Sequence, residues 1–104
     1  MAARQALQDP GNNLFVSIAA MWEITIKLSL GKLALPDSVP AALGIIGAAS
    51  LTITPAHIVR VQSLPPYHRD PFDRMMIAQA LEDGLTIVTR DHAFRAYGVP
   101  LLTA

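Results

Sequence analysis

Short apolar segments alternate with helical segments along this chain, and this alternation constrains the fold more than any other feature of the sequence. Turn-forming residues separate the segments, as at Asp9–Asn13 before the first apolar run and at Gly84 before the third. Strands that alternate with helices are typical of α/β folds built on a parallel sheet. We therefore expect an α/β fold with parallel strands at Leu14–Val16, Leu51–Thr54, Leu85–Thr89 and Val99–Leu102.

The clearest helix signal lies between Asp70 and Gly84. Asp70 is a good N-cap, Pro71 suits a first helical turn, apolar residues follow at helical spacing, and Gly84 is a typical end point. Shorter helices are expected over residues 38–48, from Pro55 onward, and over His92–Tyr97, where Asp91 and Gly98 are the expected caps.

One segment, Trp22–Leu30, fits two kinds of structure. Its apolar and polar residues alternate without a break, which is typical of a strand. A helix is favoured instead by Ser17 as N-cap, by the spacing of Glu23 and Lys27, and by Gly31 as an end point. These patterns alone support the two interpretations about equally.

The composition indicates one folded domain without cysteine chemistry. The chain has 104 residues, 52% of them hydrophobic and 15% charged, with a formal net charge of zero. Such a length suits a single domain, and zero net charge means that any contact with nucleic acid must be local. The absence of cysteine excludes a disulfide scaffold, a thiolate metal site and a cysteine nucleophile. No apolar run approaches the roughly 20 residues that span a bilayer, so we expect a cytoplasmic protein without a membrane partner.

Three acidic residues are candidates for one metal site. In an open parallel sheet, ligands bind at the carboxyl ends of the strands. Asp91 follows the strand expected to end at Thr89, Asp73 lies in the first turn of the helix that precedes this strand, and Glu23 lies one to two turns past the first strand. Converging carboxylates suit Mg²⁺ or Mn²⁺.

Each of these acids also has a purely structural explanation. Asp91 and Asp70 suit helix caps, Asp73 suits the dipole of a first turn, and Glu23 suits an ion pair with Lys27. For Asp70 the cap is the preferred explanation. Asp73 shares a helix face with Ile77, Ala80 and Gly84, and this small apolar face is expected to pack on the sheet, which favours a functional role for Asp73.

The basic residues near the acids have two interpretations as well. Arg69, Arg74 and Arg90 flank the Asp motifs, where they either bind RNA phosphates or pair with the acids. His68 is interpreted mainly as a loop residue that holds the Pro65–Pro66 turn, and His57 as a surface or packing residue.

Three segments together resemble the VapC-type PIN domains. The segment Ser17–Leu33 is similar to the family pattern "S..S.WEIaIK..lGKL". His68–Ala80 resembles "HRDPFDRlliAQA", and Gly84–Phe94 resembles "GlplvT.D..F". The motifs are long, lie in the family's order and extend over essentially the whole chain.

This resemblance implies a fold and an activity. The implied fold is a PIN-like three-layer α/β/α sandwich with a parallel sheet, in which residues 19–30 form a helix. The implied activity is metal-dependent cleavage of RNA by a toxin of a type II toxin–antitoxin system, with Mg²⁺ (or Mn²⁺) as cofactor. The matching acids, expected to be catalytic and metal-binding, are Glu23, Asp73 and Asp91. The implied partners are an RNA substrate, a cognate antitoxin and a second copy of the chain in a homodimer.

The chain departs from the family pattern at its N-terminus. Family members begin with a strand that resembles "lLLDTHaLLW", and the Asp of this strand is the first metal ligand. Nothing in Met1–Asp9 matches it, so we expect residues 1–104 to be a single PIN domain that lacks its central first strand and the fourth carboxylate. Two hypotheses follow: a ribonuclease, or a catalytically inactive remnant that keeps only the surfaces for the antitoxin and for self-association.

Overall fold

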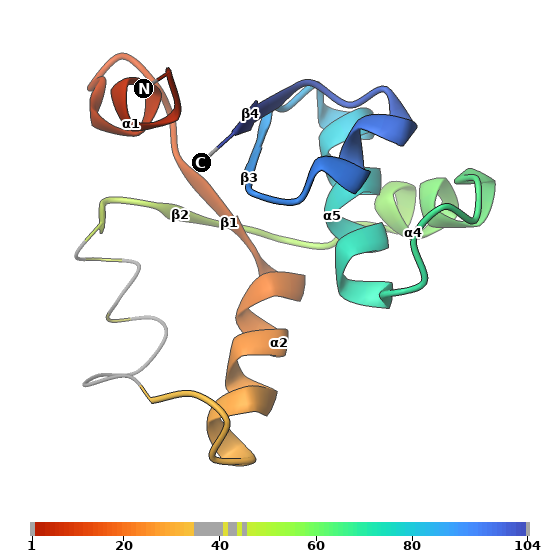
Figure 1. The fold of residues 1–104 in the computed structure, drawn as a ribbon, viewed down its shortest axis with the longest axis horizontal. Helices are drawn as coiled ribbons and strands as arrows, with labels where there is room; N and C mark the ends of the chain where they lie inside the picture. The colour runs from red at the N-terminus through yellow and green to blue at the C-terminus, as the bar shows by residue number, and fades with distance from the viewer. Residues whose placement is uncertain (1, 35–40, 42–43, 45, 104) are drawn as a thin grey trace. The chain divides into compact units, whose positions relative to one another are not determined.

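The computed structural model describes residues 2–34, 41, 44 and 46–103, and these fall into two compact units. The larger unit combines Met1–Asn12 with Thr54–Ala104, and the smaller unit is Asn13–Ile53. Both units contain helices and one pair of parallel strands (Figure 1). The expected α/β class with parallel strands is therefore confirmed.

The larger unit contains most of the helices. Its elements are α1 (Ala2–Gln8), α4 (Pro55–Ser63), α5 (Pro71–Asp83), β3 (Ile87–Thr89), the 3₁₀ helix η1 (His92–Tyr97) and β4 (Leu101–Thr103). Strand β3 pairs in parallel with β4, with Ile87 opposite Leu101 and Thr89 opposite Thr103. Helices α4 and α5 pack against each other beside this sheet (Figure 1).

The core of the larger unit is built around the middle of α5, where four consecutive residues are buried. Ile77 and Ala78 are completely buried, and the cluster around them also contains Leu64, Ala80, Phe94, Tyr97 and Val99. Leu85, Ile87 and Leu101 pack against it from the strands and their approaches. Burial of apolar surface at this scale is the main force that fixes α5 and η1 in the unit. Helices α5 and η1, which carry the acidic residues described below, are therefore anchored in the core.

The helix ends in this unit follow from their capping residues. Asp70 accepts hydrogen bonds at Oδ1 from the backbone N–H groups of Phe72 (2.8 Å) and Asp73 (3.2 Å), so it is the N-cap of α5 as expected. Gly84 ends α5 with φ +68°, a left-handed conformation that favours glycine. Asp91 caps η1 by accepting from the backbone N–H of Ala93, as expected from the sequence.

The smaller unit contains β1 (Phe15–Ser17), α2 (Ile18–Ser29) and β2 (Ala49–Leu51), with β1 and β2 parallel. The ambiguous segment is thus a helix, as the family resemblance implied. Ser17 caps it by accepting from the backbone N–H of Ala19 (3.0 Å). The alternation of apolar and polar residues therefore does not mark a buried strand face here. Trp22, one of its apolar residues, lies on the helix surface and is 61% exposed.

Strands β2, β3 and β4 are shorter than expected, whereas β1 has the expected length and is displaced by one residue. The predicted strand Leu51–Thr54 is wrong beyond Leu51, because Thr54 instead caps α4 and accepts from the backbone N–H of His57. The predicted start at Leu85 is also wrong, because its N–H donates to Ala80 O and completes the end of α5 (2.9 Å). The helix predicted over residues 38–48 lies largely outside the described residues.

Each described strand has a single described strand partner, β2 for β1 and β4 for β3. No described helix is long and apolar enough to cross a bilayer.

Candidate metal site

Two of the three predicted site acids lie close together in the larger unit. Asp73 is in the first turn of α5, and Asp91 follows β3 as the N-cap of η1. Both positions follow from local structure: the cap at Asp70 starts α5 three residues before Asp73, and the turn after Thr89 places Asp91 at the carboxyl end of β3. The expectation that these two acids converge at the carboxyl end of a parallel strand agrees with this geometry.

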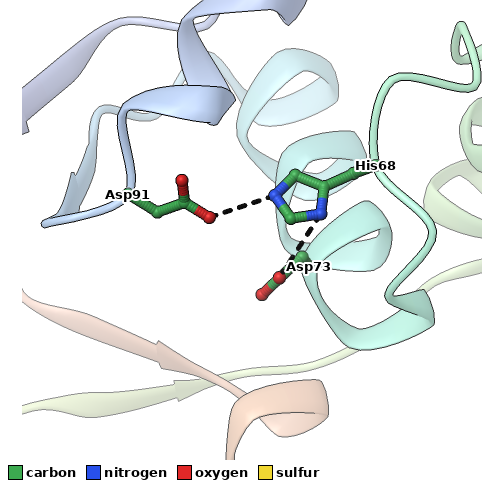
Figure 2. A group of neighbouring side chains, drawn as sticks. All are labelled: His68, Asp73 and Asp91. Atoms are coloured by element: carbon green, nitrogen blue, oxygen red, sulfur yellow. Dashed lines mark hydrogen bonds and ion pairs between the residues drawn. The ribbon is translucent and has the colours of Figure 1, made fainter.

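A histidine joins the two carboxylates. The Nε2 atom of His68 is 3.1 Å from Asp91 Oδ2, and its Nδ1 atom is 3.7 Å from Asp73 Oδ2 (Figure 2). One donor atom from each of the three residues lies within 4.8 Å of the others. The sequence interpretation of His68 as a turn-holding loop residue missed this place.

The carboxylate of Asp91 is engaged at both oxygens. Oδ1 accepts from the backbone N–H of Ala93 (2.9 Å), and Oδ2 accepts from the imidazole of His68. The hydrogen bond from the backbone N–H of Ala93 is the main reason that the pKa of Asp91 lies below its ordinary value. Desolvation opposes this shift, and the neighbouring His68 and His92 lower the pKa further. Asp91 is therefore an anion that can offer lone pairs to a cation.

The surroundings of Asp73 differ from those of Asp91. The Asp73 side chain is 22% exposed, whereas that of Asp91 is 47% exposed. Asp73 lies one turn before Ile77, which is completely buried. The interpretation that placed Asp73 on the apolar face of its helix agrees with this burial.

Glu23 belongs to the smaller unit. It lies in α2, and its Oε2 atom is 3.7 Å from Nζ of Lys27, which is the pair expected from their spacing. This pair is compatible with the structural explanation for Glu23. Its membership of a site with Asp73 and Asp91 stays a prediction.

Arg74 has a structural role that the sequence interpretation did not include. Its guanidinium donates to four backbone carbonyls: those of Pro65 (3.0 Å), His68 (3.4 Å), Val61 (3.1 Å) and Leu64 (3.4 Å). It thereby ties the end of α4 and the following loop to the first turn of α5. Arg69 and Arg90 are exposed and stay candidates for phosphate contacts.

His57 is buried, which agrees with the packing role and not with the surface position among the two interpretations of this residue. Only 1% of it is exposed. Its Nδ1 accepts from the backbone N–H of Thr54 (3.0 Å), and its Nε2 is 2.9 Å from Asp83 Oδ2. Because Nδ1 is an acceptor here, the ring proton is on Nε2 and is donated to Asp83.

The comparison with known families agrees with these features. The model of the PIN domain family matches residues 1–100. This chain belongs to the PIN domain family. Membership indicates a nuclease-type function, and PIN domains generally use divalent metals. No curated protein matches the chain.

The donor set at this PIN site is chemically suited to a divalent cation. Two carboxylates and one imidazole present their donor atoms within 4.8 Å of one another. Carboxylate oxygens are the preferred protein ligands of Mg²⁺ and Mn²⁺, and an imidazole nitrogen is tolerated better by Mn²⁺ than by Mg²⁺. Asp73 and Asp91 are therefore the described residues best suited to hold such an ion.

Proposed function

We propose that this PIN domain is a VapC-type endoribonuclease toxin of a type II toxin–antitoxin system, which hydrolyses cytoplasmic RNA with Mg²⁺ or Mn²⁺. The observation that supports this most strongly is the convergence of Asp73 and Asp91 on His68, with donor atoms within 4.8 Å. Phosphodiester hydrolysis in such enzymes depends on a cation held by carboxylates.

In this proposal Asp73, Asp91 and Glu23 are the residues that hold the ion. A bound divalent cation lowers the pKa of a coordinated water and stabilises negative charge on the scissile phosphate. The part played by the chain is to supply anionic oxygens in fixed places. Asp91 is oriented by the Ala93 N–H and by His68, and Asp73 is fixed by the capped first turn of α5. Exposed Arg69 and Arg90 supply local positive charge for the RNA backbone.

The proposal includes a single three-layer α/β/α domain over residues 1–104, completed by a first strand that carries the remaining Asp. Within the described residues, β1 pairs only with β2 and β3 only with β4. In the proposal, the added strand pairs with β1 and with β3, satisfies N–H and C=O groups of these strands and brings a fourth carboxylate to their carboxyl ends.

The protein partners in the proposal are a cognate antitoxin and a second copy of the chain. Helix α4 offers apolar surface for such contacts, since Ile58 is 58% and Val59 66% exposed. Val59 also lines a shallow hollow together with Pro55, Ala56, Arg60, Ser63 and Glu82. Exposed apolar side chains that gather on one helix are typical of protein interfaces.

The decisive experiment compares Asp73→Asn with Asp70→Asn. Cleavage of a mixed cellular RNA is measured with Mg²⁺ or Mn²⁺, using the 104-residue chain and the same chain preceded by a family-type strand with its Asp. We expect cleavage by the extended chain, none detectable by the chain alone, and none after Asp73→Asn. Asp70→Asn is the matched control, because Asn keeps the helix cap while removing one negative charge.

The alternative, an inactive remnant, predicts a different result. The extended chain would then fold and form its protein complexes but would leave RNA intact in both metals. Cleavage that survives Asp73→Asn would remove Asp73 from the site. Cleavage that survives chelation by EDTA would refute metal dependence.

A further inference from the structure

The side chain of His68 contacts both candidate metal ligands but has a directional bond to only one. The distance from Nε2 to Asp91 Oδ2 is 3.1 Å, which is a hydrogen bond, whereas the 3.7 Å from Nδ1 to Asp73 Oδ2 is too long for one (Figure 2). A carboxylate has no proton to give, so Nε2–H is the donor. His68 therefore acts on Asp91 more directly than on Asp73.

This hydrogen bond sets the orientation of the Asp91 carboxylate. The other oxygen, Oδ1, accepts from the Ala93 N–H at 2.9 Å. With one donor on each oxygen, the carboxylate plane is fixed, and without His68 only the Ala93 contact would remain. An ionised carboxylate oxygen has about two lone pairs, so a donor on Oδ2 leaves one free for a cation.

His68 is itself held by contacts outside the cluster. Its backbone N–H donates to the hydroxyl of Tyr97 (2.6 Å), and its ring meets the ring of Phe94 edge to face, with centroids 5.3 Å apart. Phe94 is 4% and Tyr97 9% exposed, so both belong to the core. The carbonyl of His68 accepts from Arg74 (3.4 Å). A donor fixed in this way is already in place before any ion binds.

We propose that His68 is a positioning residue of the metal site, whose Nε2–H holds the Asp91 carboxylate so that Oδ2 and Asp73 face one cation. The inference rests on the proposed function, in which both acids are ligands. Hydrogen-bonding partners of metal ligands typically contribute about 10–100-fold to metal affinity. Loss of the Nε2–H donor should have an effect of this size on Mn²⁺ binding.

Two amide variants separate the ring nitrogens. The side-chain NH₂ of His68→Gln reaches the place of Nε2, whereas that of His68→Asn reaches only the place of Nδ1. Both variants lose the ring contact with Phe94, so a merely structural role would affect them alike. Binding of Mn²⁺ to the whole chain is measured by paramagnetic broadening of backbone amide signals, which detects weak sites. We expect His68→Asn to weaken binding about 10–100-fold and His68→Gln to weaken it less than about 5-fold.

A second measurement keeps the inference testable if His68→Asn does not fold. In the wild-type chain, the ¹⁵N signals of the His68 ring are followed during titration with Mg²⁺. A positioning role requires Nε2 to keep its proton in the metal-bound protein. Loss of that proton on binding would make His68 a direct ligand through Nε2 and would overturn the inference.

The remaining outcomes distinguish the inference from the proposed function. If His68→Gln and His68→Asn weaken Mn²⁺ binding equally, or if neither weakens it, the positioning role is overturned. Binding of Mn²⁺ by the wild-type chain would still support the metal site. Wild-type Mn²⁺ binding without RNA cleavage by the extended chain refutes the nuclease and leaves the role of His68 supported by the two variants. A wild-type chain that binds no Mn²⁺ overturns both.

Discussion

At the scale of single residues, two neighbours at the start of α5 have divided tasks. Asp73 faces the candidate metal site, while the guanidinium of Arg74 donates to carbonyls of Val61, Leu64, Pro65 and His68. The planar guanidinium has five N–H donors, which is why one side chain can serve several acceptors at once. Arg74 therefore determines where the loop that carries His68 lies relative to Asp73.

Replacing Arg74 should destabilise the fold. Arg74→Ala removes the charged donor that these four carbonyls share, and we expect the free energy of unfolding to fall by about 2 kcal/mol. Arg74→Lys should recover little, because a single ammonium group cannot reach all four carbonyls. Urea denaturation followed by circular dichroism measures both. Arg69→Ala, at an exposed position, is the control and should change stability by less than about 0.5 kcal/mol.

At the scale of elements, α4 is tied to the end of α5 through one buried side chain. The N-terminus of α4 is closed by a capping box in which Thr54 and His57 bond to each other's backbone N–H groups. The same His57 ring then reaches Asp83 in the last turn of α5 at 2.9 Å. The packing of the two helices is thus fixed by a polar contact in addition to apolar burial.

Removing the carboxylate of Asp83 should show how much this contact contributes to the free energy of unfolding. Asp83→Ala leaves the Nε2–H of a ring that is 1% exposed without its acceptor, and we expect a loss of about 1–3 kcal/mol in the free energy of unfolding. Asp83→Asn keeps an acceptor oxygen and should cost less. Glu82→Ala breaks only the exposed pair with Arg60 and should cost no more than about 1 kcal/mol. Equal losses in all three variants, measured by thermal unfolding, would contradict this assignment.

The elements show which parts of the structure local patterns can predict. The ends of α5 and η1 were predictable because Asp70, Gly84, Asp91 and Gly98 act on backbone groups within a few residues. The strand ends were not predictable, because Thr54 and Leu85 form hydrogen bonds with the neighbouring helices α4 and α5 and do not belong to the strands. Motif resemblance, and not periodicity, identified α2 as a helix. The place of His68 depends on Tyr97, 29 residues later in the chain, and no local pattern contains that contact.

At the scale of the whole molecule, the proposed first strand bears on stability. Strands β1 and β3 each have one described strand partner, and the proposal pairs each of them with that strand as well. Neighbouring strands lie about 4.8 Å apart, and unpaired edges favour aggregation or strand exchange. Adding such a strand is therefore expected to change both the stability of the chain and its self-association.

Supplying a family-type N-terminal strand should stabilise the protein independently of its acid. New ladder hydrogen bonds and apolar contacts are expected to raise the Tm of the chain by about 10 °C, which corresponds to roughly 1–2 kcal/mol for a domain of this size. The matched control carries Asn in place of the strand's Asp. It should show the same rise in Tm but no RNA cleavage. A rise in Tm that requires the Asp would contradict the separation of folding from metal binding.

Self-association should depend on the apolar surface of α4. We expect the double variant Ile58→Asp and Val59→Asp to shift the extended chain from dimer toward monomer, because charged side chains are costly to bury in an interface. Light scattering coupled to size-exclusion chromatography measures the mass. Gln62→Asp, on the same helix at an exposed polar position, is the control and should leave the mass unchanged. A dimer that persists in the double variant would place the contact elsewhere.

The hydrogen bond from the His68 amide to the Tyr97 hydroxyl, 2.6 Å long, has a practical consequence for observing this site in solution. Backbone amides in loops normally exchange with deuterated water quickly, since no ladder or helix protects them. The amide of His68 is an exception whose protection depends on η1 and the loop remaining docked to each other. Its exchange rate therefore reports how often the two segments part, without any label or substrate. Because Tyr97 both positions His68 and protects its amide, exchange of this one amide proton measures the opening of the site.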